Sequence, residues 1–316
     1  FGSYCGIQDL AAVSRANQIC NAYGVDTISC GATIAFAMEC FEKGMITSAD
    51  TGGLELRFGD ADAMLEILHQ IVTASTPLGK LLGQGSERAA RTWGPAAQAC
   101  LITVKGEEAP AHMPQAKKSL ALIYAVNPFG ADHQSSEHDW MYEEECAPFY
   151  LERLKHLGLS TPPPAGSFNA EKVRFAALTQ VFYSLLDTLD LCQFVWGPAW
   201  TLYGPIETVE LVRAVTGWDV TLDELMQVGQ RRLNLLRWFN TREGFSRSQD
   251  SLPAKFFTPL GGTGPTANVV VNEQEFQSAL NQYYELNGWT SDGVPTPDTL
   301  QRLKLDWVIP DSQQPT

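Results

Sequence analysis

The 316-residue sequence lacks long hydrophobic runs and carries few basic residues. Its apolar stretches, such as LALIYAV at 120–126, are far too short to span a bilayer. No basic segment followed by a hydrophobic one is visible, so we expect no signal peptide. Lys and Arg number 22 against 36 Asp and Glu, which gives a net charge of −14. These features argue against a membrane protein and against nucleic acid as a partner, because nucleic acids bind clustered basic side chains.

Paired cysteines are absent as well. The cysteines are odd in number and scattered, and no two form a CxxC pair. This usage is typical of a cytoplasmic protein and argues against a disulfide framework. The spacing therefore predicts no complete metal site. The seven cysteines are Cys5, Cys20, Cys30, Cys40, Cys100, Cys146 and Cys192.

Helical periodicity, in contrast, runs through most of the chain. Apolar residues recur at spacings of three and four, and the length allows two packed units. A Gly- and Pro-rich stretch at 93–118, with a short strand-like LITV run, is the best boundary candidate. We expect a mainly α protein of two packed helical domains, 1–100 and 101–316. Helices are expected near 11–23, 32–43 with a start at Asp26, Thr27 or Ser29, 61–76, 119–126, 170–192, 206–215, 221–239, 273–286 and 296–303.

The stretch NAYGVDTISCG at 21–31 joins two predicted helices. Gly24 is placed to end the first, and the next begins within a few residues. The first turn of a helix exposes unpaired N–H groups that suit an anion or a polar heterocycle. Asp26 either caps this helix or accepts hydrogen bonds from ring N–H groups of a ligand. Capping is the simpler interpretation, because Asp is a favoured N-cap residue.

The stretch DTLDLC at 187–192 repeats this plan at the end of the predicted helix 170–192. An acid is followed by a few residues, a leucine and a terminal residue that can bind a ligand. Two such turns can hold the two halves of one cofactor. Cys192 is either a metal ligand or a buried structural thiol, since free cysteines are often buried.

Two further stretches are rich in ionisable residues. In FGADHQSSEHD (129–139), His133 and His138 accompany three acids. The stretch is either a metal-binding or acid–base cluster or a solvated polar loop. Their spacing is not that of a known zinc site. The stretch 231–253 holds five arginines among aromatic residues. It is either a docking surface for an acidic partner or a solvated helix face with internal ion pairs.

An ordered set of segments resembles the aldehyde ferredoxin oxidoreductase family over nearly the whole chain. The segments are GIQDLAAVSRANQICNAYGVDTIS, GATIAFAMECFEKGMIT, TGGLELRFGDADAM, DTLDLCQF, RWFNTREGFSR, LPAKFF and YYELNGWTSDGVPTPDTLQRLKL. The resemblance implies the family's two helical domains without its N-terminal β-rich pterin domain. It also implies a tungsten (or molybdenum) ion held by two pterins, beside a [4Fe–4S] cluster.

The implied function is the C-terminal part of an enzyme that oxidises aldehydes to carboxylic acids. Its implied partners are ferredoxin or a similar one-electron carrier and a small aldehyde, with a homodimer as a candidate assembly. One alternative is a family member that reduces another acyl substrate, such as an aromatic acid or a thioester. Another is a non-catalytic helical fragment that serves as an interaction module. A zinc hydrolase built on His133 and His138 lacks a third ligand.

The resemblance also implies roles for individual residues. The family's pterin-binding motif, an acid, two residues and then Gly-Leu-Asp or Gly-Leu-Cys, falls on 21–26 and 187–192. Asn21, Asp26, Asp187 and Leu191 thereby match pterin-contacting positions.

Two more residues take roles from the family, and the motifs also depart from it. Cys192 matches the fourth cluster ligand, and His133 matches a histidine near the tungsten that handles protons. Asn21 replaces the expected first acid, and Asp190 stands where glycine is commoner. The family's CxxCxxxC segment is absent, and one cysteine cannot hold a cubane. We therefore expect the isolated chain to be incomplete for catalysis.

Overall fold

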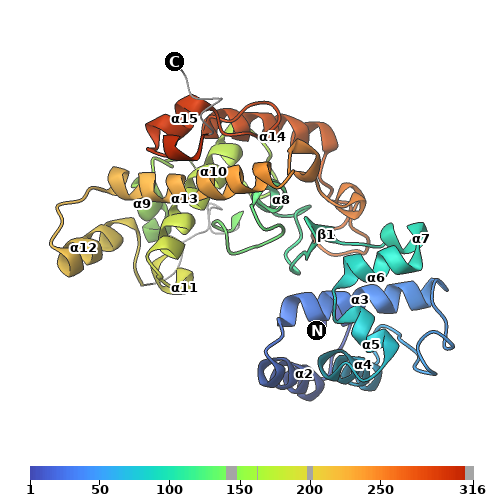
Figure 1. The fold of residues 1–316 in the computed structure, drawn as a ribbon. Helices are drawn as coiled ribbons and strands as arrows, with labels where there is room; N and C mark the ends of the chain where they lie inside the picture. Colours follow the sequence, from blue (N-terminus) through green and yellow to red (C-terminus); the bar gives the residue numbers. More distant parts are fainter. Residues whose placement is uncertain (140–147, 162, 198–201, 310–316) are drawn as a thin grey trace. The chain divides into compact units, whose positions relative to one another are not determined.

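The chain forms two compact helical units (Figure 1). The computed structural model describes residues 1–139, 148–161, 163–197 and 202–309. Unit 1 comprises residues 1–112 with 253–255, and unit 2 comprises 113–252 with 256–316. Within the described residues, two short strands form one antiparallel hairpin, and all other regular elements are helices. The mainly α fold class is confirmed, whereas the family domain boundary expected at residue 100 stays a prediction.

Unit 1 is built around α3 (Thr27–Glu42), which is buried along much of its length. The carboxylates of Asp9, Asp26 and Asp60 accept hydrogen bonds from N–H groups in the first turns of α2, α3 and α4. Such caps satisfy donors that a helix cannot pair internally. The remaining elements are α1 (Gly2–Cys5), α2 (Leu10–Tyr23), α4 (Ala61–Thr73), α5 (Pro77–Leu82), α6 (Ser86–Trp93), α7 (Pro95–Gln98), β1 (Thr103–Val104) and β2 (Glu107–Glu108).

Unit 2 is organised by α10 (Ala170–Thr188), which packs against α8, α13 and α14 (Figure 1). Helix α13 approaches very closely, because a Cβ at Gly229 would lie 2.1 Å from the carbonyl oxygen of Val181. The Ser184 hydroxyl donates to the Gly229 carbonyl oxygen at 3.1 Å. The other elements from residue 113 onward are α8 (Lys118–Val126), α9 (Pro148–Lys155), α11 (Gln193–Trp196), α12 (Pro205–Thr216), α13 (Leu222–Arg242), η2 (Arg247–Gln249), η3 (Ala254–Phe257), α14 (Glu273–Asn287), α15 (Pro297–Arg302) and η4 (Asp306–Val308).

The arginine-rich stretch contributes a buried ion pair to unit 2. Arg237 and Asp250 form two contacts, Nη1 to Oδ1 at 2.9 Å and Nη2 to Oδ2 at 2.8 Å, with side chains 1% and 0% exposed. The Arg237 guanidinium also lies over the rings of Tyr284 and Trp289. For Arg237, the interpretation as part of an internal ion pair is therefore correct, and the interpretation as a docking surface is wrong.

One predicted helix end is wrong. The predicted helix 170–192 ends at Thr188, because Asp190 adopts a left-handed conformation with φ of 54°. In the described part of the chain, no helix combines the length and apolar character needed to cross a membrane.

Candidate functional site

The two turns singled out in the sequence share one backbone plan. Helix α2 ends at Gly24, which is left-handed with φ of 70°, and the Val25 N–H donates back to the Cys20 carbonyl oxygen at 3.0 Å. Helix α10 ends in the same way: Asp190 is left-handed, and the Leu191 N–H donates to the Leu186 carbonyl oxygen at 2.9 Å. Both are helix C-terminal motifs that a left-handed residue makes possible.

Each turn then places its last residue at the start of another helix. Asp26 is the N-cap of α3, and Cys192 is the N-cap of α11. Gly24 and Asp190, which hold the same position in the two turns, are therefore both left-handed residues. This explains physically why glycine is preferred there and why Asp, one of the better tolerated alternatives, can replace it.

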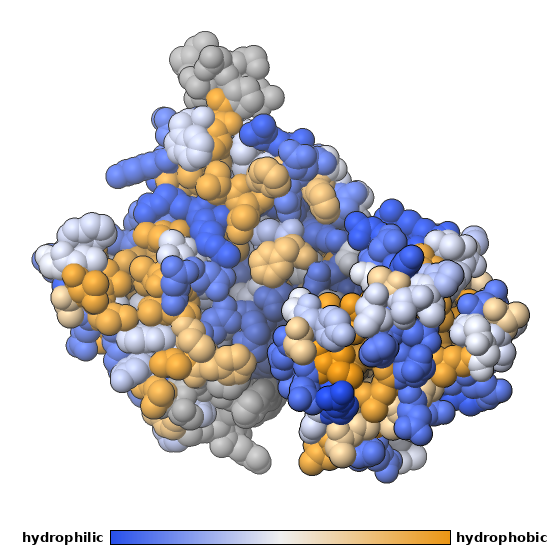
Figure 2. All heavy atoms as spheres, turned by 60° about the horizontal axis from the view of Figure 1, so that its bottom comes forward, coloured by the Kyte–Doolittle hydropathy of each residue, from blue (hydrophilic) through white to orange (hydrophobic). Residues whose placement is uncertain are grey.

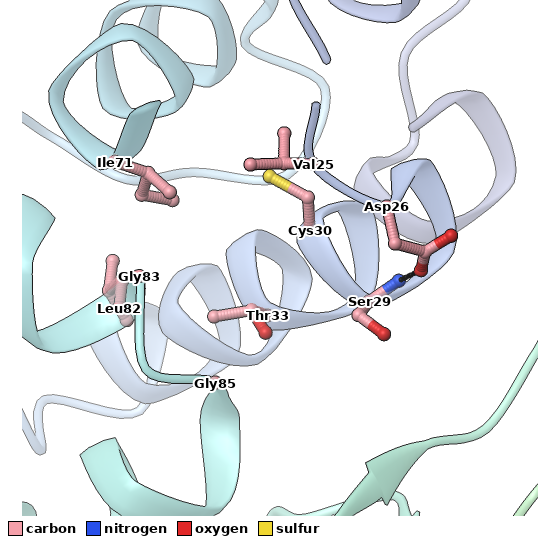
Figure 3. Close-up of a pocket in the computed structure, with 9 residues that line it drawn as sticks. All are labelled: Val25, Asp26, Ser29, Cys30, Thr33, Ile71, Leu82, Gly83 and Gly85. Carbon is pink, nitrogen blue, oxygen red and sulfur yellow. Dashed lines mark hydrogen bonds between the residues drawn. The ribbon is translucent and has the colours of Figure 1, made fainter. Parts of the chain in front are cut away.

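In unit 1, Asp26 caps its helix and borders a pocket. Its Oδ2 accepts the Ser29 N–H at 2.6 Å, so the capping interpretation is correct. Asp26 and Ser29 border a cavity of about 230 Å³. Figure 3 shows both residues at one side of the group that lines it. Asn21 is exposed in the last turn of α2, on the chain segment that leads to this pocket. The residues that line the pocket are Val25, Asp26, Ser29, Cys30, Thr33, Ile71, Leu82, Gly83 and Gly85.

Two acids of the β hairpin accept hydrogen bonds from polar side chains that line this pocket. The Ser29 hydroxyl donates to Glu107 at 3.3 Å, and the Thr33 hydroxyl donates to the buried Glu108 at 3.1 Å. Glu108 also accepts the N–H and the hydroxyl of Ser86, both at 2.8 Å, at the start of α6. Sequence reasoning missed Glu108, because its three contacts join segments that lie far apart in the chain.

In unit 2, Asp187 lies in the last turn of α10 with both carboxylate oxygens engaged. Gln193 donates to Oδ1 at 3.0 Å, and Arg232 pairs with Oδ2 at 3.1 Å. Burial raises the pKa of the Asp187 carboxyl, and so does the nearby charge of Asp132, whereas Arg232 and Gln193 lower it. The charge of Asp132 in the 129–139 loop thus acts on Asp187 in the 187–192 turn.

The thiol of Cys192 is exposed, so the expectation of a buried structural thiol is wrong. The preceding side chain behaves differently, because Leu191 packs against the apolar core of unit 2. It helps to line an apolar pocket of about 400 Å³ formed by residues of α10, α12 and α13. Figure 2 shows hydrophobic side chains gathered at the end of unit 2 that carries α12.

His133 lies in the loop before α9, with its side chain 15% exposed. Burial lowers the pKa of its imidazole, and the charge of Lys117 acts in the same direction, while Asp132 opposes them with Oδ1 4.0 Å from Nδ1. The ring is therefore neutral at pH 7 and can accept a proton. His138 fixes the loop locally, because its Nε2 donates to the His133 carbonyl oxygen at 2.9 Å.

The rest of this loop is buried rather than solvated. Glu137 accepts the Tyr183 hydroxyl at 2.7 Å, and Asp139 pairs with Lys172; all four side chains are almost fully buried. The solvated-loop interpretation is therefore wrong. Within the described residues, no group of three or more His, Cys, Asp or Glu side chains is arranged to bind a metal. Of the two cluster interpretations, acid–base chemistry is therefore favoured over a metal site.

Comparison with known proteins decides the family. The sequence model of "Aldehyde ferredoxin oxidoreductase, domains 2 & 3" matches residues 1–305. The chain belongs to this family. A tungsten-containing aldehyde ferredoxin oxidoreductase of Pyrococcus horikoshii is 31% identical over 310 residues, which are 96% of this chain and 47% of the relative.

One further relative and one solved structure are also similar to the chain. The aliphatic sulfonate oxidoreductase, WOR-like subunit, of Pyrococcus furiosus is 26% identical and covers 96% of this chain and 44% of the relative. Among solved structures, the active site complex BamBC of benzoyl coenzyme A reductase has a TM-score of 0.74 at 21% identity, over 95% of this chain and 47% of that chain. This second likeness concerns the fold alone. The chain spans about half the length of the curated relatives that it matches.

Proposed function

We propose that this chain is the helical, cofactor-binding part of a tungsten (or molybdenum) bis-pterin, iron–sulfur oxidoreductase. The enzyme oxidises small aldehydes to carboxylic acids and passes the electrons to ferredoxin or a similar one-electron carrier. The observation that carries the proposal is the repeated turn: two helix ends with the same backbone plan, each followed by a residue that can bind a ligand. The reaction and the metal are those of the tungsten-containing aldehyde ferredoxin oxidoreductases to which the chain is similar.

Each of the two turns offers hydrogen-bond acceptors that suit a pterin ring. A pterin ring carries N–H groups that need acceptors, and Asp26 and Asp187 offer ionisable carboxylates. A carboxylate has about four acceptor positions, so one contact to Ser29 leaves capacity on Asp26. Asp187 likewise has lone pairs beyond those used by Gln193 and Arg232. Asn21 can contribute only an amide, and Leu191 only its backbone carbonyl group, because its side chain is packed in the core.

The described residues offer only part of the ligand set that an iron–sulfur cluster needs. The exposed Cys192 can supply one thiolate. A [4Fe–4S] cubane takes four, so the other three ligands would come from outside the described residues. Cys146 also lies outside the described residues.

His133 is our candidate for proton transfer. The tungsten–pterin group, when bound, supplies two-electron chemistry, and a one-electron cluster passes those electrons on singly. Conversion of RCHO and H₂O to RCOOH also releases two protons. The neutral imidazole of His133 can accept one at a ring nitrogen, and His138 holds the His133 backbone in place. Asp132 stabilises the imidazolium that results.

The test compares three Asp→Asn variants in the purified enzyme that contains this chain. D26N keeps an N-cap, because Asn caps as well as Asp does, but it removes the carboxylate. D187N removes the carboxylate from the last turn of α10, and D60N is the matched control, an N-cap of α4 in unit 1. We expect D26N and D187N to lose pterin and tungsten affinity by about tenfold or more, as charged hydrogen bonds are lost.

The measurement is tungsten and pterin content per chain after dialysis, together with aldehyde oxidation. D60N should retain both. If D26N and D187N kept the same content as D60N, the proposed pterin site would be wrong.

A further inference from the structure

Arg232 reaches across from α13 to the carboxylate of Asp187. Its Nη1 lies 3.1 Å from Asp187 Oδ2 and donates to the Ser184 hydroxyl oxygen at 3.3 Å. The two charged side chains are 32% and 35% exposed, so the pair lies at the edge of unit 2, open to a ligand. Ser184 and Asp187 are one turn apart on α10, and Arg232 contacts both.

The close crossing of α10 and α13 makes this contact possible. Gly229 presses its backbone against Val181, and its carbonyl oxygen accepts the Ser184 hydroxyl. Arg232 follows Gly229 by three residues, so it lies on the same face of α13 and one turn further along. A larger residue at position 229 would hold the helices apart and carry the guanidinium away from Asp187.

Asp26 and Asp187 lie at opposite ends of their helices. Asp26 lies at the N-terminus of α3, where the partial positive charge of the helix and the Ser29 N–H stabilise a carboxylate. Asp187 lies in the last turn of α10, where the helix end carries partial negative charge. Asp132 adds a second unfavourable charge. An ionised Asp187 therefore needs a cation, and Arg232 is the ion-pair partner that the described structure records.

We propose that Arg232 is a positioning residue that holds Asp187 ionised and fixed, so that Asp187 can accept ring N–H groups of the pterin. This inference rests on the proposed function. Protonation of Asp187 would turn one carboxylate oxygen into a hydroxyl donor and remove the negative charge, so its hydrogen bonds from ring N–H groups would be fewer and weaker. Arg232 thus stabilises the carboxylate of the second turn, as the N-terminus of α3 stabilises the carboxylate of Asp26 in the first turn.

The first experiment measures Asp187 directly, without cofactor. The carboxyl carbon of Asp187 is titrated by ¹³C NMR in the purified chain, in the wild type and in R232M, R232K and R231M. R231M is the matched control, because it removes the same charge from the neighbouring position of α13, for which the described structure records no ion pair. We expect R232M to raise the pKa of Asp187 by about one unit or more. R232K should return the pKa most of the way to its wild-type value, and R231M should leave the pKa unchanged.

The second experiment measures pterin retention against pH in the complete enzyme. Because Asp187 would be protonated at a higher pH in R232M, its pterin should be lost at a higher pH than in the wild type. R232K should move the midpoint back. A general structural defect would lower retention at all pH values and would not be rescued by lysine. If R232M fails to fold, R232Q takes its place, since it also removes the charge.

The outcomes separate this inference from the proposed function. If D187N loses pterin but R232M matches R231M in both measurements, the role of Arg232 is wrong and the pterin site stands. If D187N retains pterin like the wild type, the pterin role of Asp187 is wrong, and the inference fails with it. A raised Asp187 pKa together with a shifted retention midpoint in R232M supports both.

Discussion

Asp190 occupies a left-handed backbone conformation, with φ of 54°, at the end of α10. Such a conformation costs most L-residues about 1–2 kcal/mol, and Asp somewhat less. Replacement by glycine removes this cost but gives the unfolded chain more freedom. We therefore predict that D190G raises the free energy of unfolding by about 0.5–1 kcal/mol, measured by urea denaturation.

The control for this prediction is D190N. It removes the same charge from the C-terminal end of the helix but keeps a side chain at the left-handed position. A stability gain in D190G that does not exceed the gain in D190N would mean that charge, and not backbone conformation, governs this residue.

At the scale of elements, the contact between α10 and α13 depends on the absence of one side chain. An alanine at Gly229 improves helix propensity by about 1 kcal/mol, yet its Cβ would lie 2.1 Å from the Val181 carbonyl oxygen. Because the backbone of α10 cannot move away cheaply, we predict that G229A lowers the free energy of unfolding by about 1–3 kcal/mol. Urea denaturation measures this change.

G166A is the comparison variant, because a Cβ at Gly166 meets no atom within 4 Å. It should change the free energy of unfolding by less than about 0.5 kcal/mol. The Asp187 pKa gives a second readout, since separation of the helices in G229A should raise it as R232M does. A G229A variant as stable as G166A would show that the crossing can widen without cost.

At the scale of the whole molecule, each unit has its own hydrophobic core. The core of unit 1 includes Ile34, and unit 2 holds the buried Arg237–Asp250 pair. D250N would leave the Arg237 guanidinium buried without a counter-charge, at a cost of roughly 3–5 kcal/mol. We predict that D250N weakens amide hydrogen-exchange protection in unit 2, while I34A, a buried truncation costing about 2–5 kcal/mol, weakens it in unit 1.

Hydrogen exchange read by mass spectrometry locates each effect. The prediction is contradicted if D250N lowers protection as strongly in the α2–α4 peptides as in the α13–α14 peptides. In that case the two compact units would unfold as one cooperative body.

Local sequence determined the helices, their caps and the two turns. Aspartate or threonine precedes several helices, and glycine ends several others, because these residues pair the free N–H groups or adopt a left-handed conformation within a few residues of chain. The turn at Gly24 was predicted for this reason, whereas the left-handed turn at Asp190 was not, because the helix was expected to continue to residue 192. The order of the family segments also indicated the aldehyde ferredoxin oxidoreductase family from the sequence alone.

Only the tertiary structure decided which ionisable groups share an environment. No local pattern indicates that Arg232 pairs with Asp187 across 45 residues, that Glu108 closes the wall of the Asp26 pocket, or that Arg237 is buried. It also corrected the solvated-loop interpretation of 129–139 and the buried-thiol interpretation of Cys192. Burial and charge pairing depend on distances between segments that the chain brings together only after packing, whereas caps and turns depend on neighbours in sequence.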